Sequence, residues 1–231
     1  MAKKYMPDQA RLPELLELVK GSDSVELKLT VSDTDVRSVV QSLGMDPLDA
    51  QIRQAVFFDT PDLRLNQAGV VVRARRIQGG RGDTVIKLRP VVPAQLPDEL
   101  RRAGSFGVEV DVIPGGFVCS ASMKGKATAE EVRKVILQDA PIKGLFSKDQ
   151  RAFYKQHAPE GLKLNDLSIL GPITLLKLKY VPEGFPGVSW PSFGCSRTAR
   201  ASSSYRPSVS RARPCRSGAS GAPTSTSAEY S

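Results

Sequence analysis

Residues 69–90 read GVVVRARRIQGGRGDTVIKLRP, and this stretch predicts a β-hairpin. Residues 70–77 are rich in β-branched side chains and predict the first strand. Residues 78–83 contain the glycines that a tight turn with positive φ favours, and residues 84–90 predict the returning strand. The centre of the chain is therefore expected to form two neighbouring antiparallel strands.

The cations of this hairpin recur at every second position. Because side chains alternate between the two faces of a strand, Arg73 and Arg75 are expected on one face. For the same reason, Lys87 and Arg89 share one face of the returning strand. Each strand thus puts two cations on one side and apolar groups on the other.

Composition narrows the class of protein. The 231 residues suffice for one sizeable domain or two small ones, and the net charge of +9 favours anionic partners. No apolar run of about 18 residues exists, so neither a transmembrane helix nor a membrane partner is expected. The three cysteines lack metal-type spacing and the first residues lack the apolar run of a signal peptide, so a cytoplasmic protein is the default.

The last part of the chain differs in composition from the rest. Residues 191–231 contain twelve Ser and six Arg but no Leu, Ile, Met or Lys, and with one Glu they carry +5 (six minus one) of the total +9. Such a segment cannot bury enough apolar surface to fold alone. We therefore expect an N-terminal segment at 1–22, one folded domain at 23–190, and a disordered or aberrant tail at 191–231.

Further elements follow from local patterns. Two capping boxes, Thr128 with Glu131 and Ser147 with Gln150, predict two helix starts, and the second helix should run to about His157. Strands and helices elsewhere are predicted by alternation and by helical spacing of apolar residues. The predicted strands are residues 24–31, 54–59, 107–113 and 173–181, and the other predicted helices lie in residues 7–19 and 35–43.

The polar positions of these strands are sorted by the sign of their charge. The cations are Lys28, Arg73, Arg75, Lys87, Arg89, Lys177 and Lys179, and the acids are Glu26, Glu109 and Asp111. One interpretation is a half-exposed antiparallel sheet with a charged outer face. The other is a closed β-barrel with a charged lumen, in which the cations surround an anion because like charges on adjacent strands repel.

A linear triphosphate suits such a lumen, since it accepts from many Arg and Lys side chains at once. The acids cannot serve that anion directly, but they can hold Mg²⁺ or Mn²⁺, which bridge to phosphate oxygens. This chemistry would favour phosphoryl transfer.

Several motifs resemble those of one known family, the CYTH domain or triphosphate tunnel metalloenzymes. The most specific is FFDTPDLRL at residues 57–65, followed by GVVVRARR at 69–76. The resemblance covers about residues 24–180. Further matches are VELKL at 25–29, IKLR at 86–89, VEVD at 108–111 and KDQRAFY at 148–154.

The resemblance implies an α+β fold, an eight-stranded antiparallel β-barrel with flanking helices that forms a metal-dependent triphosphate tunnel. It also implies metal ligands at Glu26, Glu109 and Asp111, of which Glu109 and Asp111 form the catalytic acid pair, with Mg²⁺ or Mn²⁺ as the ion. For Arg151, a solvated helix face is an equal alternative. The implied substrate-binding residues are Lys28, Arg73, Arg75, Lys87, Arg89, Arg151, Lys177 and Lys179.

Two departures from the family pattern affect these expectations. The family opens with Glu-x-Glu-x-Lys, and Ser24 stands where the first Glu belongs. The family also finishes with further wall strands, whereas here the pattern stops near Trp190. We hypothesise a frameshifted or divergent C-terminus, which would leave the barrel incomplete.

Several functions stay open on these residues. The leading hypothesis is hydrolysis of an inorganic, nucleoside or other organic triphosphate. A non-catalytic module that binds polyphosphate or nucleotide is the first alternative, and cyclisation of ATP in the same tunnel is another. Specific nucleic-acid binding through the arginines of the tail is not expected. The sequence fixes neither the particular triphosphate nor the oligomeric state.

Overall fold

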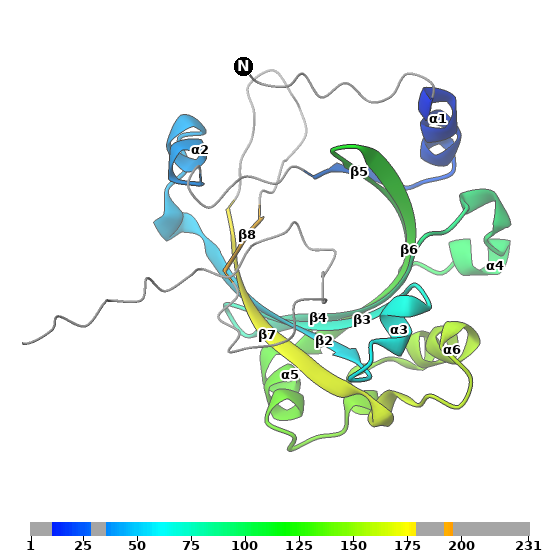
Figure 1. Ribbon diagram of the computed structural model, residues 1–231. Coiled ribbons are helices and arrows are strands. Elements are labelled where there is room, and N and C mark those ends of the chain that lie inside the picture. The colour runs from blue at the N-terminus through cyan, green and yellow to red at the C-terminus, as the bar shows by residue number, and fades with distance from the viewer. Residues whose placement is uncertain (1–10, 29–35, 179–191, 196–231) are drawn as a thin grey trace, which may run out of the picture.

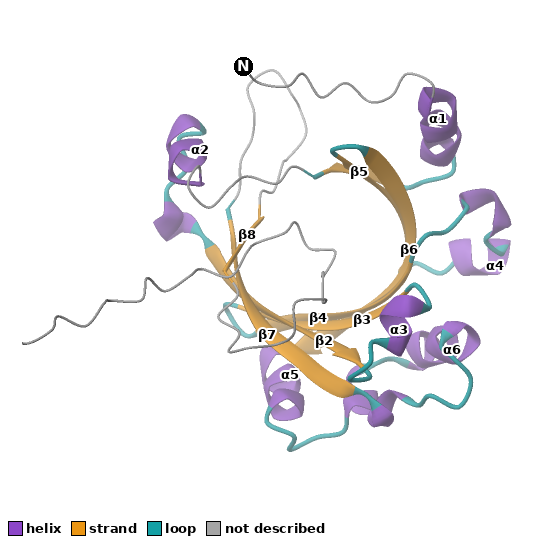
Figure 2. Cartoon of the chain, in the orientation of Figure 1, coloured by secondary structure: helices purple, strands orange, loops and turns teal. Residues whose placement is uncertain are grey.

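The computed structural model describes residues 11–28, 36–178 and 192–195, and these form one strongly curled β-sheet with helices against its outer face (Figure 1). Figure 2 shows the strands enclosing a common centre while the helices lie outside the curve. The strands, in spatial order, are β1 (Ser24–Leu27), β5 (Phe106–Ile113), β6 (Gly116–Thr128), β4 (Arg81–Leu88), β3 (Val70–Ile77), β2 (Gln51–Asp59), β7 (Ser168–Lys177) and β8 (Ser192–Cys195).

The strands pair antiparallel, with one exception. β1 runs parallel to β5, and parallel neighbours need a long connection, which here contains β2, β3 and β4. Among the described residues no hydrogen-bonded ladder joins β1 to β8, so the sheet is curled but open. The predicted α+β class is confirmed in its incomplete form, and the parallel β1–β5 pair corrects the expectation of a wholly antiparallel sheet.

The central hairpin forms as predicted, with a shorter turn. Gly79 and Gly80 adopt positive φ, as a turn of this kind needs. β4 begins at Arg81 rather than Thr84, because Asp83 still pairs with Arg75 across the ladder. The register therefore places Asp83 directly opposite an arginine.

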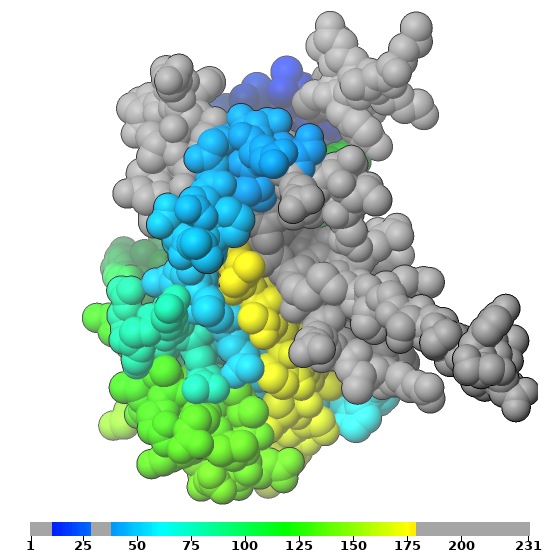
Figure 3. Space-filling view, turned by 90° about the vertical axis from the view of Figure 1, so that its left-hand side faces the viewer, coloured from blue at the N-terminus to red at the C-terminus, as the bar shows by residue number. Residues whose placement is uncertain are grey.

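The strand bounds differ from the predictions at several ends. β2 begins at Gln51 rather than residue 54, and β7 begins at Ser168 rather than residue 173. Figure 3 shows β7 in yellow running beside β2 on one face of the molecule, as their ladder requires. β8 lies inside the segment after residue 190 for which the sequence predicts no fold; the rest of that segment lies outside the described residues.

The main core lies between the outer face of the sheet and two helices. Val56, Val72 and Ile86 are fully buried there, together with Val132 of α5 (Ala129–Ile136) and Phe153 of α6 (Lys148–His157). Both predicted capping boxes are confirmed at the starts of α5 and α6. Because apolar side chains fill the outer face, the alternating polar positions are directed to the inner, concave face.

The remaining helices are short. The helix predicted in residues 7–19 is α1 (Leu12–Lys20), and that predicted in 35–43 is α2 (Val36–Ser42). No helix in the described ranges is long and apolar enough to span a bilayer. The others are α3 (Arg64–Gln67), α4 (Asp98–Arg101) and the 3₁₀ turns η2 (Pro47–Asp49), η3 (Pro93–Gln95), η4 (Ile142–Leu145) and η5 (Leu164–Asp166).

Candidate active site

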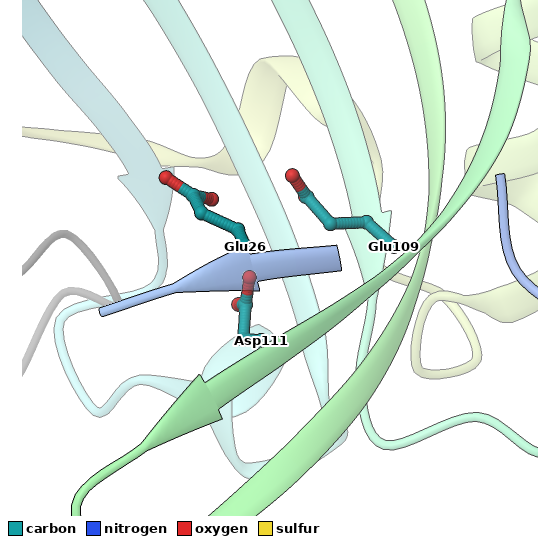
Figure 4. A group of neighbouring side chains, drawn as sticks. All are labelled: Glu26, Glu109 and Asp111. Carbon is teal, nitrogen blue, oxygen red and sulfur yellow. The ribbon is translucent and has the colours of Figure 1, made fainter. Parts of the chain in front are cut away.

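Three carboxylates meet on the inner face. Glu26, Glu109 and Asp111 each offer an oxygen within 4.8 Å of the others, and Figure 4 shows the three side chains extending from β1 and β5. The parallel register explains the meeting: Glu26 lies opposite Asp111, and Glu109 is two residues earlier on the same face of β5. Asp111 is buried, Glu109 is half-buried and Glu26 is exposed.

The same register places Ser24 opposite Glu109. Ser24 therefore lies at the edge of the carboxylate group. Its side chain offers a hydroxyl there, not a carboxylate.

Two lysines neutralise these carboxylates. The Nζ of Lys28 lies 2.7 Å from Oδ2 of Asp111 and 3.3 Å from Oε2 of Glu26. The Nζ of Lys87 lies 2.8 Å from Oε2 of Glu109. Burial alone would raise the pKa of Glu109, but the charge and hydrogen bond of Lys87 outweigh it, so that this pKa is lowered. Oδ1 of Asp111 is buried and has no hydrogen-bond partner among the described residues.

A second group of charges lies on β3 and β4. Arg75 binds Asp83 through Nε, 2.9 Å from Oδ1, and through Nη2, 2.7 Å from Oδ2. Nη2 of Arg73 is 3.9 Å from Oδ1 of the same carboxylate. Burial and the neighbouring charge of Arg75 lower the pKa of Arg73 to about 10. One carboxylate thus faces two guanidinium groups, and the excess charge here is positive.

Arg53 belongs to this group, although the sequence reasoning passed over it. Its register partners in β3 and β7 are Ile77 and Leu175. Burial and then the charge of Arg75 lower the pKa of Arg53, and Asp83 opposes this shift. The predicted strand began one residue too late to include Arg53. Extending the alternation of Ala55 and Phe57 backwards by one step would have found it.

The other predicted site residues differ in placement. Lys177 lies at the end of β7, where burial and then the charge of Arg53 lower its pKa. Arg89 is half-buried directly after β4. Arg151 is not brought to the inner face: α6 packs on the outer face, and Nη1 of Arg151 donates to the carbonyl oxygen of Phe146 at 2.7 Å. Lys179 lies outside the described residues.

Comparisons with known proteins support the fold. No family model matches the sequence, and no curated protein matches it. The crystal structure of a "putative adenylate cyclase" from Bacillus halodurans matches with a TM-score of 0.50 at 12% identity, over 75% of this chain and 76% of that chain. A "putative adenylyl cyclase" from Hippeastrum, HpAC1, described as having a dominant triphosphatase activity, matches with a TM-score of 0.46 at 14% identity, over 71% and 69% of the two chains. The first likeness shows the fold, which is consistent with the CYTH-like fold that the motifs indicate.

Proposed function

We propose that this chain is a CYTH-type enzyme that hydrolyses a triphosphate on the inner face of its curled sheet. One observation carries the proposal: three carboxylates lie within 4.8 Å of one another on the same face as an excess of arginines and lysines. Carboxylates alone, or arginines and lysines alone, are common on protein surfaces without any ligand. Together they match an anion that is held by cations and activated by a divalent metal.

The carboxylate group fits a divalent cation. Glu26, Glu109 and Asp111 are oxygen ligands of the kind that Mg²⁺ and Mn²⁺ prefer. The buried Oδ1 of Asp111 has no partner in the part of the chain that the structure describes, which leaves one oxygen available to an ion. When bound, Mg²⁺ or Mn²⁺ would supply Lewis-acid polarisation of a phosphoryl oxygen.

The cations of the chain would bind and stabilise the phosphates. In hydrolysis a water oxygen forms a bond to a terminal phosphorus and the bridging P–O bond breaks. The diphosphate leaves with the electron pair of that bond, and the proton lost by the water passes to the diphosphate or to solvent. Negative charge builds on the leaving group, and fixed cations nearby lower the energy of that state. The residues proposed for this role are Lys28, Arg73, Arg75, Lys87, Arg89 and Lys177.

The test is release of orthophosphate from inorganic triphosphate and from ATP, with Mg²⁺, Mn²⁺ or EDTA. The double variant Glu109→Gln/Asp111→Asn keeps the shape of the site and removes two charges. Release that needs the metal and disappears in the variant supports the proposal. Pyrophosphate and cyclic AMP in place of orthophosphate would indicate cyclisation of ATP, the reaction named for the Bacillus halodurans neighbour.

Binding without turnover is the second candidate, and Ser24 favours it. The hydroxyl opposite Glu109 leaves the metal site with three carboxylates, two of them paired with Lys28. A triphosphate-induced rise in melting temperature without phosphate release would identify a binding module. Under the hydrolase proposal, Ser24→Glu is expected to raise the turnover rate at low Mg²⁺, because it adds a ligand at the edge of the group.

The proposed partner is therefore a small molecule with a triphosphate group, and the proposed location is the cytoplasm, where nucleoside triphosphates are available. The residues proposed above contact only the phosphates. Comparing inorganic triphosphate with ATP in the same assay tests whether the triphosphate carries a further group.

A further inference from the structure

Arg53 lies on the inner face at a distance from the carboxylates along the sheet. In the spatial order of strands, β3, β4 and β6 separate β2 from β5. Because the sheet curls, β2 and β5 form facing walls around the common centre (Figure 1). The inner face thus has an acidic wall at Glu26, Glu109 and Asp111, and a basic wall around Arg53.

The guanidinium of Arg53 is held in place without being neutralised. Its Nε and Nη2 donate to Oε1 of Gln51 at 3.0 and 2.7 Å. Among the described residues, no carboxylate lies within 4.0 Å of this guanidinium. An amide oxygen orients the group but leaves its charge, and Nη1 is not engaged by Gln51.

The neighbours of Arg53 add to this positive charge. Burial is the largest cause that lowers the pKa of Lys177, and the charge of Arg53 is the second. Burial likewise lowers the pKa of Arg53 most, followed by the charge of Arg75. Three cations therefore repel one another at one wall. Glu26 partly offsets this repulsion for Lys177, and Asp83, already bound to Arg75, is the carboxylate that all three share. Such a cluster is stabilised when an anion joins it.

We propose that Arg53 is a specificity-determining residue that binds the phosphoryl group farthest from the metal site and so selects triphosphate over diphosphate. This inference rests on the proposed function. An anion held by Lys28 and Lys87 at the carboxylate wall, with or without a metal ion, must be long enough to reach the opposite wall. Inorganic triphosphate would reach Arg53, whereas diphosphate would end among Lys28, Lys87 and Arg73.

The experiment measures binding rather than turnover. Isothermal titration calorimetry in EDTA compares inorganic triphosphate and pyrophosphate on the full chain and on Arg53→Gln. Loss of one charge-assisted contact is expected to weaken triphosphate binding about tenfold. Pyrophosphate affinity is expected to change less than about twofold, because the shorter anion makes no contact with Arg53.

Two further variants keep the test decisive. Arg76→Gln removes an arginine one residue beyond Arg75 whose Nη1 donates to Gln54, on the outer face, and it should leave both affinities unchanged. Arg53→Lys keeps the charge and is expected to retain triphosphate affinity within about threefold, even if Arg53→Gln proves unstable.

The outcomes separate this inference from the proposed function. Wild-type protein that binds triphosphate while Arg53→Gln binds it equally well overturns the inference alone. Equal losses for triphosphate and pyrophosphate overturn it too, since Arg53 would then not discriminate length. Wild-type protein that neither binds nor hydrolyses triphosphate overturns the proposed function, and the inference with it.

Discussion

The ammonium group of Lys28 lies 2.7 Å from Oδ2 of Asp111, a carboxylate whose side chain is only 5% exposed. The same ammonium reaches Glu26, so a fixed cation stands among the carboxylates proposed to bind a metal. A buried carboxylate needs such a partner, because an isolated charge in the interior is strongly unfavourable. A divalent ion must therefore compete with Lys28.

Replacing Lys28 by Met tests this competition. Without metal, the variant should lose about 3 kcal/mol of unfolding free energy, because Asp111 keeps a buried charge without its partner. Added Mn²⁺ should then raise the melting temperature of the variant more than that of the wild type. Thermal denaturation with and without Mn²⁺ measures both effects, with Lys134→Met on the exposed face of α5 as control. Equal Mn²⁺ shifts in variant and wild type would contradict the competition.

The sequence predicts which face of a strand a side chain occupies better than it predicts which strands lie side by side. Alternation alone placed Arg73 with Arg75 and Glu109 with Asp111, because it depends only on local geometry. The pairing of β1 with β5, which brings Glu26 beside Asp111, is a long-range contact between distant segments. No local pattern specifies which strands become neighbours. The family resemblance grouped the three carboxylates, but the strand pairing that brings them together is seen only in the fold.

β6 shows a second limit of local patterns. It is the longest strand, yet GFVCSASMKGKAT at Gly116–Thr128 has few of the β-branched residues that indicate strands. β6 is held on both sides, by ladders to β4 and to β5. Ser120 and Ser122 are buried on the inner face, and Gly125 lies beneath Gln150 of α6. Tertiary packing here overrides local propensity.

Arg73 is predicted to lower the unfolding free energy of the free protein and to strengthen triphosphate binding. Its guanidinium is largely buried, and burial lowers its pKa to about 10, which means that the charged form is disfavoured by its surroundings. Arg73→Met keeps the aliphatic stem and removes the charge. We expect about 1 kcal/mol more unfolding free energy without ligand and about tenfold weaker triphosphate binding.

Urea denaturation with and without inorganic triphosphate measures both quantities for Arg73→Met. Asp83 keeps its bidentate partner Arg75, so the variant leaves no carboxylate unpaired. A variant that is less stable than the wild type and binds triphosphate normally would assign Arg73 a structural role.

Tyr154 gives a prediction for alkaline pH. Burial and the nearby charges of Asp166 and Asp59 raise its pKa to about 12. Within the described ranges its buried hydroxyl has no hydrogen-bond partner. An acid whose pKa is raised on folding contributes stability below its unfolded pKa of about 10, and this is lost as pH rises towards 12. Tyr154→Phe should therefore flatten the fall in stability between these values.

Unfolding free energies measured from pH 8 to 11 provide the test for Tyr154→Phe. At pH 8 the variant should equal or exceed the wild type by up to about 1 kcal/mol, because no hydrogen bond is lost. A large loss of stability at pH 8 would mean that the hydroxyl has a partner, and the same slope with pH in both proteins would mean that Tyr154 does not titrate abnormally.

The absence of a side chain at Gly125 lets Gln150 of α6 pack directly against β6. A Cβ at this position would meet the side chains of Gln150 and Thr84, the latter at 2.6 Å. Gln150 is fully buried, accepts from Thr84 at 3.0 Å and donates to the carbonyl oxygen of Met123 at 3.1 Å. Gly125→Ala should thus cost about 2 kcal/mol of unfolding free energy.

The matched control for Gly125→Ala is Gly104→Ala, since a Cβ at Gly104 meets no atom within 4 Å. The double variant Gly125→Ala/Gln150→Ala should cost less than the sum of its single changes, because removing the Gln150 side chain makes room for the new methyl group. β6 lies between the strands that carry Lys87 and Glu109, so a displaced β6 should also weaken triphosphate binding. Additive free energies in this cycle would show that Gln150 is not what requires glycine at residue 125.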